Sequence, residues 1–175
     1  KNNYRGFYVM ATGTGKTWTA IYSAKELYSH NKVLTVIAAP YKHLVKQWAE
    51  DVKRVFRNAT IILVSSENPE WYSESIQAII QQKYDSMKQV ILITTIKSFN
   101  SSRFKHVIEQ SNKDKLLIVD EAHRFTNREE SLKTTYKYML GLSATPVNGK
   151  NNEVGMEIVN LFGGQVFALP IEVAL

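Results

Sequence analysis

Residues 10–17 read MATGTGKT and stand between a short apolar run at 8–10 and an amphipathic stretch at 16–28. The two glycines of this segment can adopt left-handed backbone conformations that turn successive amide groups toward one point. A helix that begins at Lys16 adds the partial positive charge of its N-terminus. Strand, glycine-rich turn and helix in this order predict a phosphate-binding loop, made of Thr12, Gly13, Thr14, Gly15, Lys16 and Thr17.

Two side chains of this loop carry the expected chemistry. Lys16 is placed to neutralise the β and γ phosphates of a nucleotide, and Thr17 offers a hydroxyl to Mg²⁺, which prefers oxygen ligands. The general consensus has glycine six places before the lysine, where this chain has Met10. The alternative interpretation is a Gly- and Thr-rich turn that only caps a helix.

Short apolar runs recur along the chain with helical stretches between them. Six of them are expected to be strands, at 8–10, 33–38, 61–64, 90–94, 116–119 and 139–142. They are apolar almost throughout instead of alternating, so both faces of the sheet must be covered, as in a parallel sheet. Helices are expected at 16–28, 44–56, 71–84, 99–109 and 154–162, and a last strand at 165–169. The pattern predicts an α/β fold, an open doubly wound sheet with ligands at the carboxyl ends of its strands.

An acidic motif follows one of the most apolar runs. Residues 116–119 read LLIV and deliver Asp120 and Glu121 to the carboxyl edge, where we expect them beside the phosphate loop. The first carboxylate can hold Mg²⁺ through water, and the second can orient and deprotonate an attacking water. With Lys16 and His123 they form the expected catalytic set, with Thr17 and Asp120 as the magnesium residues. The alternative is a solvated strand end.

The next apolar run ends in residues 143–146, SATP. The hydroxyls of Ser143 and Thr145 can bond His123 or the neighbouring carboxylates, and would thereby couple the nucleotide site to the rest of the protein. The alternative is an ordinary Ser/Thr turn before Pro146.

The phosphate loop, DEAH at 120–123 and SATP resemble motifs I, II and III of superfamily-two helicases in their order and approximate spacing. The resemblance implies a P-loop NTPase of RecA-like fold that uses ATP and Mg²⁺, and hydrolysis that drives movement on, or unwinding of, nucleic acid, DNA more than RNA. Within the superfamily, MATGTGKT, DEAHR at 120–124 and NLFGG at 160–164 are most similar to the motor subunits of type I and type III restriction enzymes and to excision-repair helicases.

Two further segments resemble helicase motifs Ia and Ib, at 39–48 and 93–99. In the family these loops lie on the face opposite the nucleotide and touch the nucleic-acid backbone. Hydroxyls and lysines suit phosphate contacts because they read charge and not base identity. The candidates for nucleic-acid contact are Lys42, Thr94, Thr95 and Lys97. Each could instead be an ordinary loop residue.

Composition bounds the remaining possibilities. The formal charge of +6 and pI near 9.4 favour polyanions only weakly, because acids are interspersed with the basic residues. There is no cysteine and the four histidines are far apart, which argues against a zinc site. No stretch approaches the about 20 apolar residues that span a bilayer, so we expect a cytoplasmic protein.

The domain expectation is one helicase ATP-binding domain over residues 1–175, the first RecA-like domain of a longer polypeptide. The resemblance implies a second RecA-like domain that supplies arginine fingers. Only about nine residues precede the phosphate loop, so we expect the segment that reads adenine in many relatives to be absent or truncated. The alternatives are a P-loop ATPase that acts on a partner other than nucleic acid, and a non-catalytic binding module derived from a helicase.

Overall fold

The computed structural model describes residues 4–81, 88–125, 131–144, 157–158 and 160–169. Within them, seven parallel strands form one sheet in the order β3-β4-β2-β5-β6-β1-β7. Their bounds are β1 Arg5–Met10, β2 Leu34–Ala39, β3 Thr60–Val64, β4 Val90–Thr95, β5 Lys115–Val119, β6 Tyr138–Ser143 and β7 Gln165–Leu169. The predicted α/β class and parallel sheet are confirmed.

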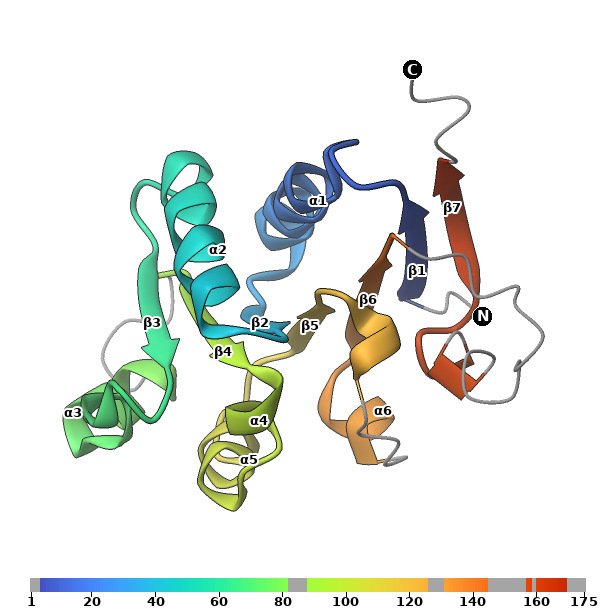
Figure 1. Ribbon diagram of the computed structural model, residues 1–175. Helices are drawn as coiled ribbons and strands as arrows, with labels where there is room; N and C mark the ends of the chain where they lie inside the picture. Colours follow the sequence, from blue (N-terminus) through green and yellow to red (C-terminus); the bar gives the residue numbers. More distant parts are fainter. Residues whose placement is uncertain (1–3, 82–87, 126–130, 145–156, 159, 170–175) are drawn as a thin grey trace.

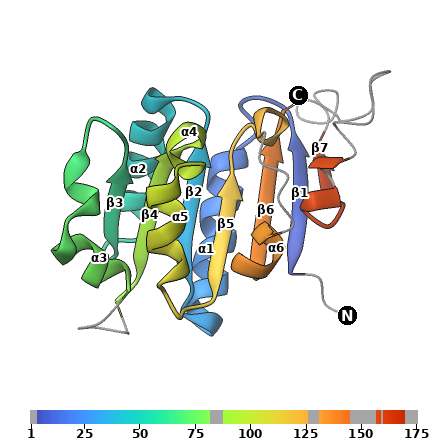
Figure 2. The same cartoon turned by 90° about the horizontal axis from the view of Figure 1, so that it is seen from below.

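Helices cover both faces of the sheet. The longer ones are α1 Lys16–Asn31, α2 Lys42–Val55, α3 Glu74–Ile80 and α5 Ser102–Glu109; the shorter ones are α4 Ile96–Phe99, α6 Ser131–Thr135 and the 3₁₀ turns η1 Pro69–Tyr72 and η2 Ala122–Arg124. Figure 1 shows α1 and α2 on one face and α3, α4, α5 and α6 on the other, and Figure 2 shows the same two layers with the sheet between them.

Each face has its own apolar core. Along β4, Ile91 and Ile93 pack with α1 and α2, whereas Val90 and Leu92 pack in the opposite cluster. Successive side chains of a strand point to opposite faces, so a strand covered on both sides must be apolar at every position. This explains why the strand sequences do not alternate.

Some predicted helix boundaries were wrong because serines cap new helices. In the expected helix at 71–84, the end of η1 is followed by α3, and Ser73 caps α3 by accepting a hydrogen bond from the amide of Ile76; residues 82–84 lie outside the described residues. The expected helix at 99–109 is likewise α4 and then α5, with Ser101 as the N-cap. Helix α6 lies in a stretch where none was expected. Of the expected helix at 154–162, residues 157, 158, 160 and 161 are helical, and 154–156 and 159 lie outside the described residues.

Among the helices that the structure describes, no long apolar one matches the thickness of a bilayer.

Candidate functional site

The predicted motifs meet at the carboxyl edge of three adjacent strands. The phosphate loop follows β1, the acid pair follows β5, and β6 lies between them, with Val9 of β1 beside Ser143 and Val119 of β5 beside Gly141. Neighbouring strands are about 4.8 Å apart, so the two motifs are separated by roughly 10 Å across the sheet. The acids were expected beside the loop; strand β6 lies between the two motifs, and its last residue, Ser143, joins the same edge.

The phosphate loop needs glycine for its backbone and not for space. Gly13 and Gly15 have φ of 82° and 91°, and a Cβ at either position would meet nothing within 4 Å. The amide and the hydroxyl of Thr14 both donate to the carbonyl of Ala11, which closes the turn. Gly15 is the N-cap of helix α1 and makes no side-chain cap, so the first amides of the helix are not occupied by a capping side chain. Such amides suit an anion.

The Lys16 ammonium folds back over the loop. Its Nζ donates to the carbonyl oxygens of Met10 at 2.9 Å and Ala11 at 3.3 Å. Met10 therefore contributes a main-chain group that any residue can supply, which explains how it can replace the expected glycine. Thr17 is half-buried one place further along α1, and Thr12 is exposed.

The carboxylate of Asp120 is buried and held from two sides. Its Oδ2 accepts from the indole Nε1 of Trp48 at 2.8 Å, and its Oδ1 accepts from the amide of Glu121 at 2.9 Å. The amide of Asp120 donates to the carbonyl of Ala38, which extends the pairing of β5 with β2 by one residue. The sequence placed Trp48 in the expected helix at 44–56 and in the segment resembling motif Ia, but not in contact with the acid pair. Its signal was the indole N–H, which finds a partner when the ring is buried.

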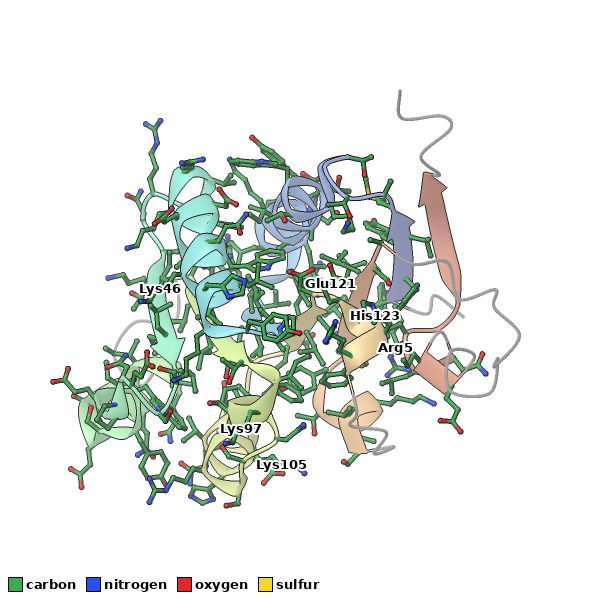
Figure 3. All side chains as sticks on the ribbon, in the orientation of Figure 1. Arg5, Lys46, Lys97, Lys105, Glu121 and His123 are labelled. Atoms are coloured by element: carbon green, nitrogen blue, oxygen red, sulfur yellow. The ribbon has the colours of Figure 1, made fainter. Side chains whose placement is uncertain are left out.

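His123 joins the acid pair to the neighbouring strand. Its Nδ1 lies 3.1 Å from the hydroxyl of Ser143 and 3.4 Å from Oε2 of Glu121. Glu121 has φ of 45°, an uncommon conformation for a residue other than glycine, and it turns the chain from β5 into η2. Figure 3 shows Glu121 and His123 close to each other at this edge. The structure thus brings Ser143 to His123, whereas Thr145 lies outside the described residues.

Residues 1–148 match the family described as the type III restriction enzyme res subunit. The chain belongs to this family. It is a superfamily-two, RecA-like helicase domain related to restriction enzymes, as the motifs predicted.

Similar proteins support the same assignment. A putative helicase, 109L, of Invertebrate iridescent virus 3 is 32% identical over 139 residues, which are 77% of this chain and 37% of the viral protein. The Pyrococcus furiosus Hef helicase domain has the same fold, with a TM-score of 0.69 and 23% identity over 96% of this chain and 35% of that chain. The type ISP restriction-modification enzyme LlaGI, solved with a DNA substrate mimic, also has this fold. Its TM-score is 0.71, and it is 19% identical over 97% of this chain and 18% of that chain. This res-family chain thus spans well under half of these relatives.

In the segments of the res-family chain that resemble motifs Ia and Ib, the candidate lysines are exposed and the candidate threonines are buried. Lys42 is exposed and forms an ion pair with Glu67, which lowers the pKa of that carboxyl. Lys97 is exposed on α4, and Figure 3 shows it on the opposite side of the sheet from α1. Thr94 is fully buried, and the hydroxyl of Thr95 caps α4 by accepting from the amide of Ser98. The two lysines are therefore the accessible members of this set, and the two threonines have structural partners.

Proposed function

We propose that this res-family domain binds ATP with Mg²⁺ at the carboxyl edge of β1, β6 and β5 and hydrolyses it to drive movement on, or unwinding of, DNA. The observation that carries the proposal is the shared edge: an uncapped helix start and left-handed glycines on one strand, and two acids on the next strand but one. A triphosphate at the loop would extend from the helix start toward the acids, because β6 between them ends in a small residue.

Lys16 is the proposed ligand of the β and γ phosphates. Its ammonium now bonds two neutral carbonyl oxygens, and exchanging them for charged phosphate oxygens would strengthen both interactions. Apart from the Thr14 amide, which closes the turn, the amides of the loop and of the first turn of α1, from Thr12 to Thr17, would hold the remaining oxygens. The lysine ammonium thus lies at the loop where the phosphates would bind.

Thr17 and Asp120 are the proposed magnesium residues. Each oxygen of the Asp120 carboxylate accepts one hydrogen bond and keeps further lone pairs, so the group suits a hydrated hard cation. Bound magnesium would neutralise charge on the phosphates. Glu121, with its side chain 30% exposed, is the proposed base that orients the attacking water and accepts a proton from it. His123 links that carboxylate to Ser143.

We further propose that nucleic acid contacts Lys42 and Lys97, with Thr94 and Thr95 shaping the same segments. A second RecA-like domain of a longer chain would complete the cleft and supply arginines; the share of relatives covered, 37% and 35%, supports this arrangement. Residues 1–175 would then form one ATP-binding domain that turns over slowly by itself, since an arginine finger is worth about 10³ to 10⁵ in rate.

The experiment measures nucleotide binding and ATPase activity with single-stranded DNA, duplex DNA, RNA and no polymer. We expect the 175-residue chain to bind ATP only with Mg²⁺ and to hydrolyse it slowly, and a longer chain with both domains to be stimulated by DNA. Fast DNA-stimulated turnover by the 175-residue chain would contradict the two-domain arrangement. If none of these polymers stimulated the ATPase activity of the longer chain, the proposed nucleic-acid motor would be wrong.

Two substitutions separate the proposed roles. Lys16→Ala removes the phosphate ligand and should abolish ATP binding, whereas Glu121→Gln keeps the shape of the side chain and should retain binding but block hydrolysis. Lys53→Ala, on the exposed end of α2, is the matched control and should bind like the unmodified chain. Equal loss of binding in Lys16→Ala and Glu121→Gln would show that the assigned roles are wrong.

A further inference from the structure

A second basic site lies at the opposite edge of the sheet, away from the motifs. A hollow of ≈ 690 Å³ opens between the second half of α1, the end of α2 and the residues that lead into β3 and β4. Its lining includes four cationic side chains, Lys25, Arg54, Arg57 and Lys88. No Asp or Glu is among the described residues that line it. A volume of this size is in the range of ligand sites.

The positive charge of the hollow is larger than the partial negative charge at the C-terminal end of α2. Arg54 forms an ion pair with Asp51 at 3.3 Å, and cations in the last turn of α2 offset the partial negative charge of that helix end. A helix end carries about half an elementary charge. Lys25 and Arg57 lie outside that turn and are exposed, and no Asp or Glu is among the described residues that line the hollow, so a positive field remains in it. The site therefore favours an anion.

Aromatic rings accompany the cations along α1. Tyr22 lines the hollow and is 56% exposed, and Trp18, one helical turn earlier, is 37% exposed with its ring centroid 6.4 Å from that of Tyr22. Large exposed rings cost free energy in water, and bases of a single strand stack on them. Cations that track phosphates beside rings that stack bases are the pattern of single-strand binding.

A buried amide at the back of the hollow lacks a partner. Gln89 lines the hollow and is 8% exposed, and its Nε2 has no hydrogen-bond partner in the described part of the chain. An unsatisfied buried amide costs about 1–3 kcal/mol. A phosphate or base oxygen in the hollow would accept this hydrogen bond after a small rotation of the side chain.

We propose that this hollow and the exposed face of α1 are a second binding track for single-stranded nucleic acid, with phosphates on Lys25, Arg57 and Lys88 and a base on Tyr22. The track shares no residue with the proposed nucleotide site or with Lys42 and Lys97. It does not require ATP. Loss of single-strand binding at this track would therefore leave ATP binding at the nucleotide site unchanged, and loss of ATP binding would leave the track unchanged.

The test is the affinity of the 175-residue chain for fluorescent oligo-dT without ATP, over a range of salt concentrations. The double variant Lys25→Gln with Arg57→Gln should bind about tenfold more weakly, and its salt slope should fall by about 1.4, since each single-strand phosphate contact contributes about 0.7. The control, Lys53→Gln with Lys105→Gln, makes the same change in net charge on residues outside the hollow. Its affinity for oligo-dT should stay close to that of the unmodified chain. Equal weakening in both doubles would overturn the proposal.

Base stacking has its own variants. Tyr22→Ala should weaken oligo-dT binding about tenfold, whereas Tyr22→Phe keeps the ring and should bind like the unmodified chain. Unlabelled oligo-dT should also displace the probe better than inorganic polyphosphate with the same number of phosphates. The proposal would be wrong if polyphosphate displaced the probe as well as oligo-dT does. It would also be wrong if Tyr22→Ala kept the affinity of the unmodified chain, or if the unmodified chain did not bind oligo-dT.

Discussion

The indole Nε1 of Trp48 donates a hydrogen bond of 2.8 Å to Oδ2 of Asp120, and both side chains are buried, at 2% and 8% exposure. The contact joins helix α2, whose first half belongs to the segment resembling motif Ia, to the first acid after β5. A displacement of α2 therefore acts directly on the orientation of that carboxylate. This is a physical route by which a partner at Lys42 would influence the proposed magnesium residue.

Trp48→Phe should lower both stability and the Mg²⁺ dependence of ATP binding. The substitution keeps an aromatic ring but removes the donor to a buried carboxylate, which costs about 1–3 kcal/mol. Chemical denaturation measures the first effect, and a magnesium titration of ATP affinity measures the second. Trp71→Phe makes the same change in the opposite core and is the control: it should leave the magnesium titration unaltered. A normal titration in Trp48→Phe would contradict a positioning role.

Gly15→Ala and Gly141→Ala should fail for different reasons. At Gly15, φ is 91° and a Cβ has free space, so alanine meets only the backbone cost of about 1–2 kcal/mol and misaligns the loop. At Gly141 a Cβ would lie 2.6 Å from the ring of Phe7, which forces the core apart. We expect loss of ATP affinity with modest destabilisation in the first variant, and mainly lower thermal stability in the second. The opposite assignment of effects would refute the loop geometry.

Ser143→Ala should weaken the coupling between nucleotide and DNA. It removes the hydroxyl 3.1 Å from Nδ1 of His123, and this contact joins the ends of β5 and β6. The measured quantity is the ratio of DNA affinities with and without a non-hydrolysable ATP analogue, which we expect to fall toward one. Ser111→Ala removes another buried hydroxyl, which lacks a hydrogen-bond partner among the described residues, and should keep the ratio. An unaltered ratio in Ser143→Ala would show that this contact does not couple the sites.

The strands and the glycine turn before α1 could be predicted from local sequence, because apolar runs and glycines at fixed positions act within a few residues. It did not predict the partner of Asp120, since Trp48 is 72 residues away in sequence and reaches it only after β2 and β5 pair. Ser73 and Ser101 interrupted predicted helices because their side chains compete for backbone amides, an effect that apolar periodicity does not register.

Tyr136 should make the fold sensitive to alkaline pH. Burial raises the pKa of its phenol above the ordinary value of 10.0, and the nearby charge of Glu109 adds to the shift. Between pH 10.0 and the raised pKa, the unfolded chain loses this proton while the folded chain keeps it, so stability falls as pH rises. The expected slope is up to about 1.4 kcal/mol per pH unit. Denaturation at pH 8 and above pH 10 gives the free energy of unfolding of the unmodified chain and of Tyr136→Phe. In the difference between the two chains, the contributions of the other titrating groups cancel. The unmodified chain should lose stability relative to the variant only at the higher pH, and an equal difference at both would place the phenol in water and not in the core beside Phe99.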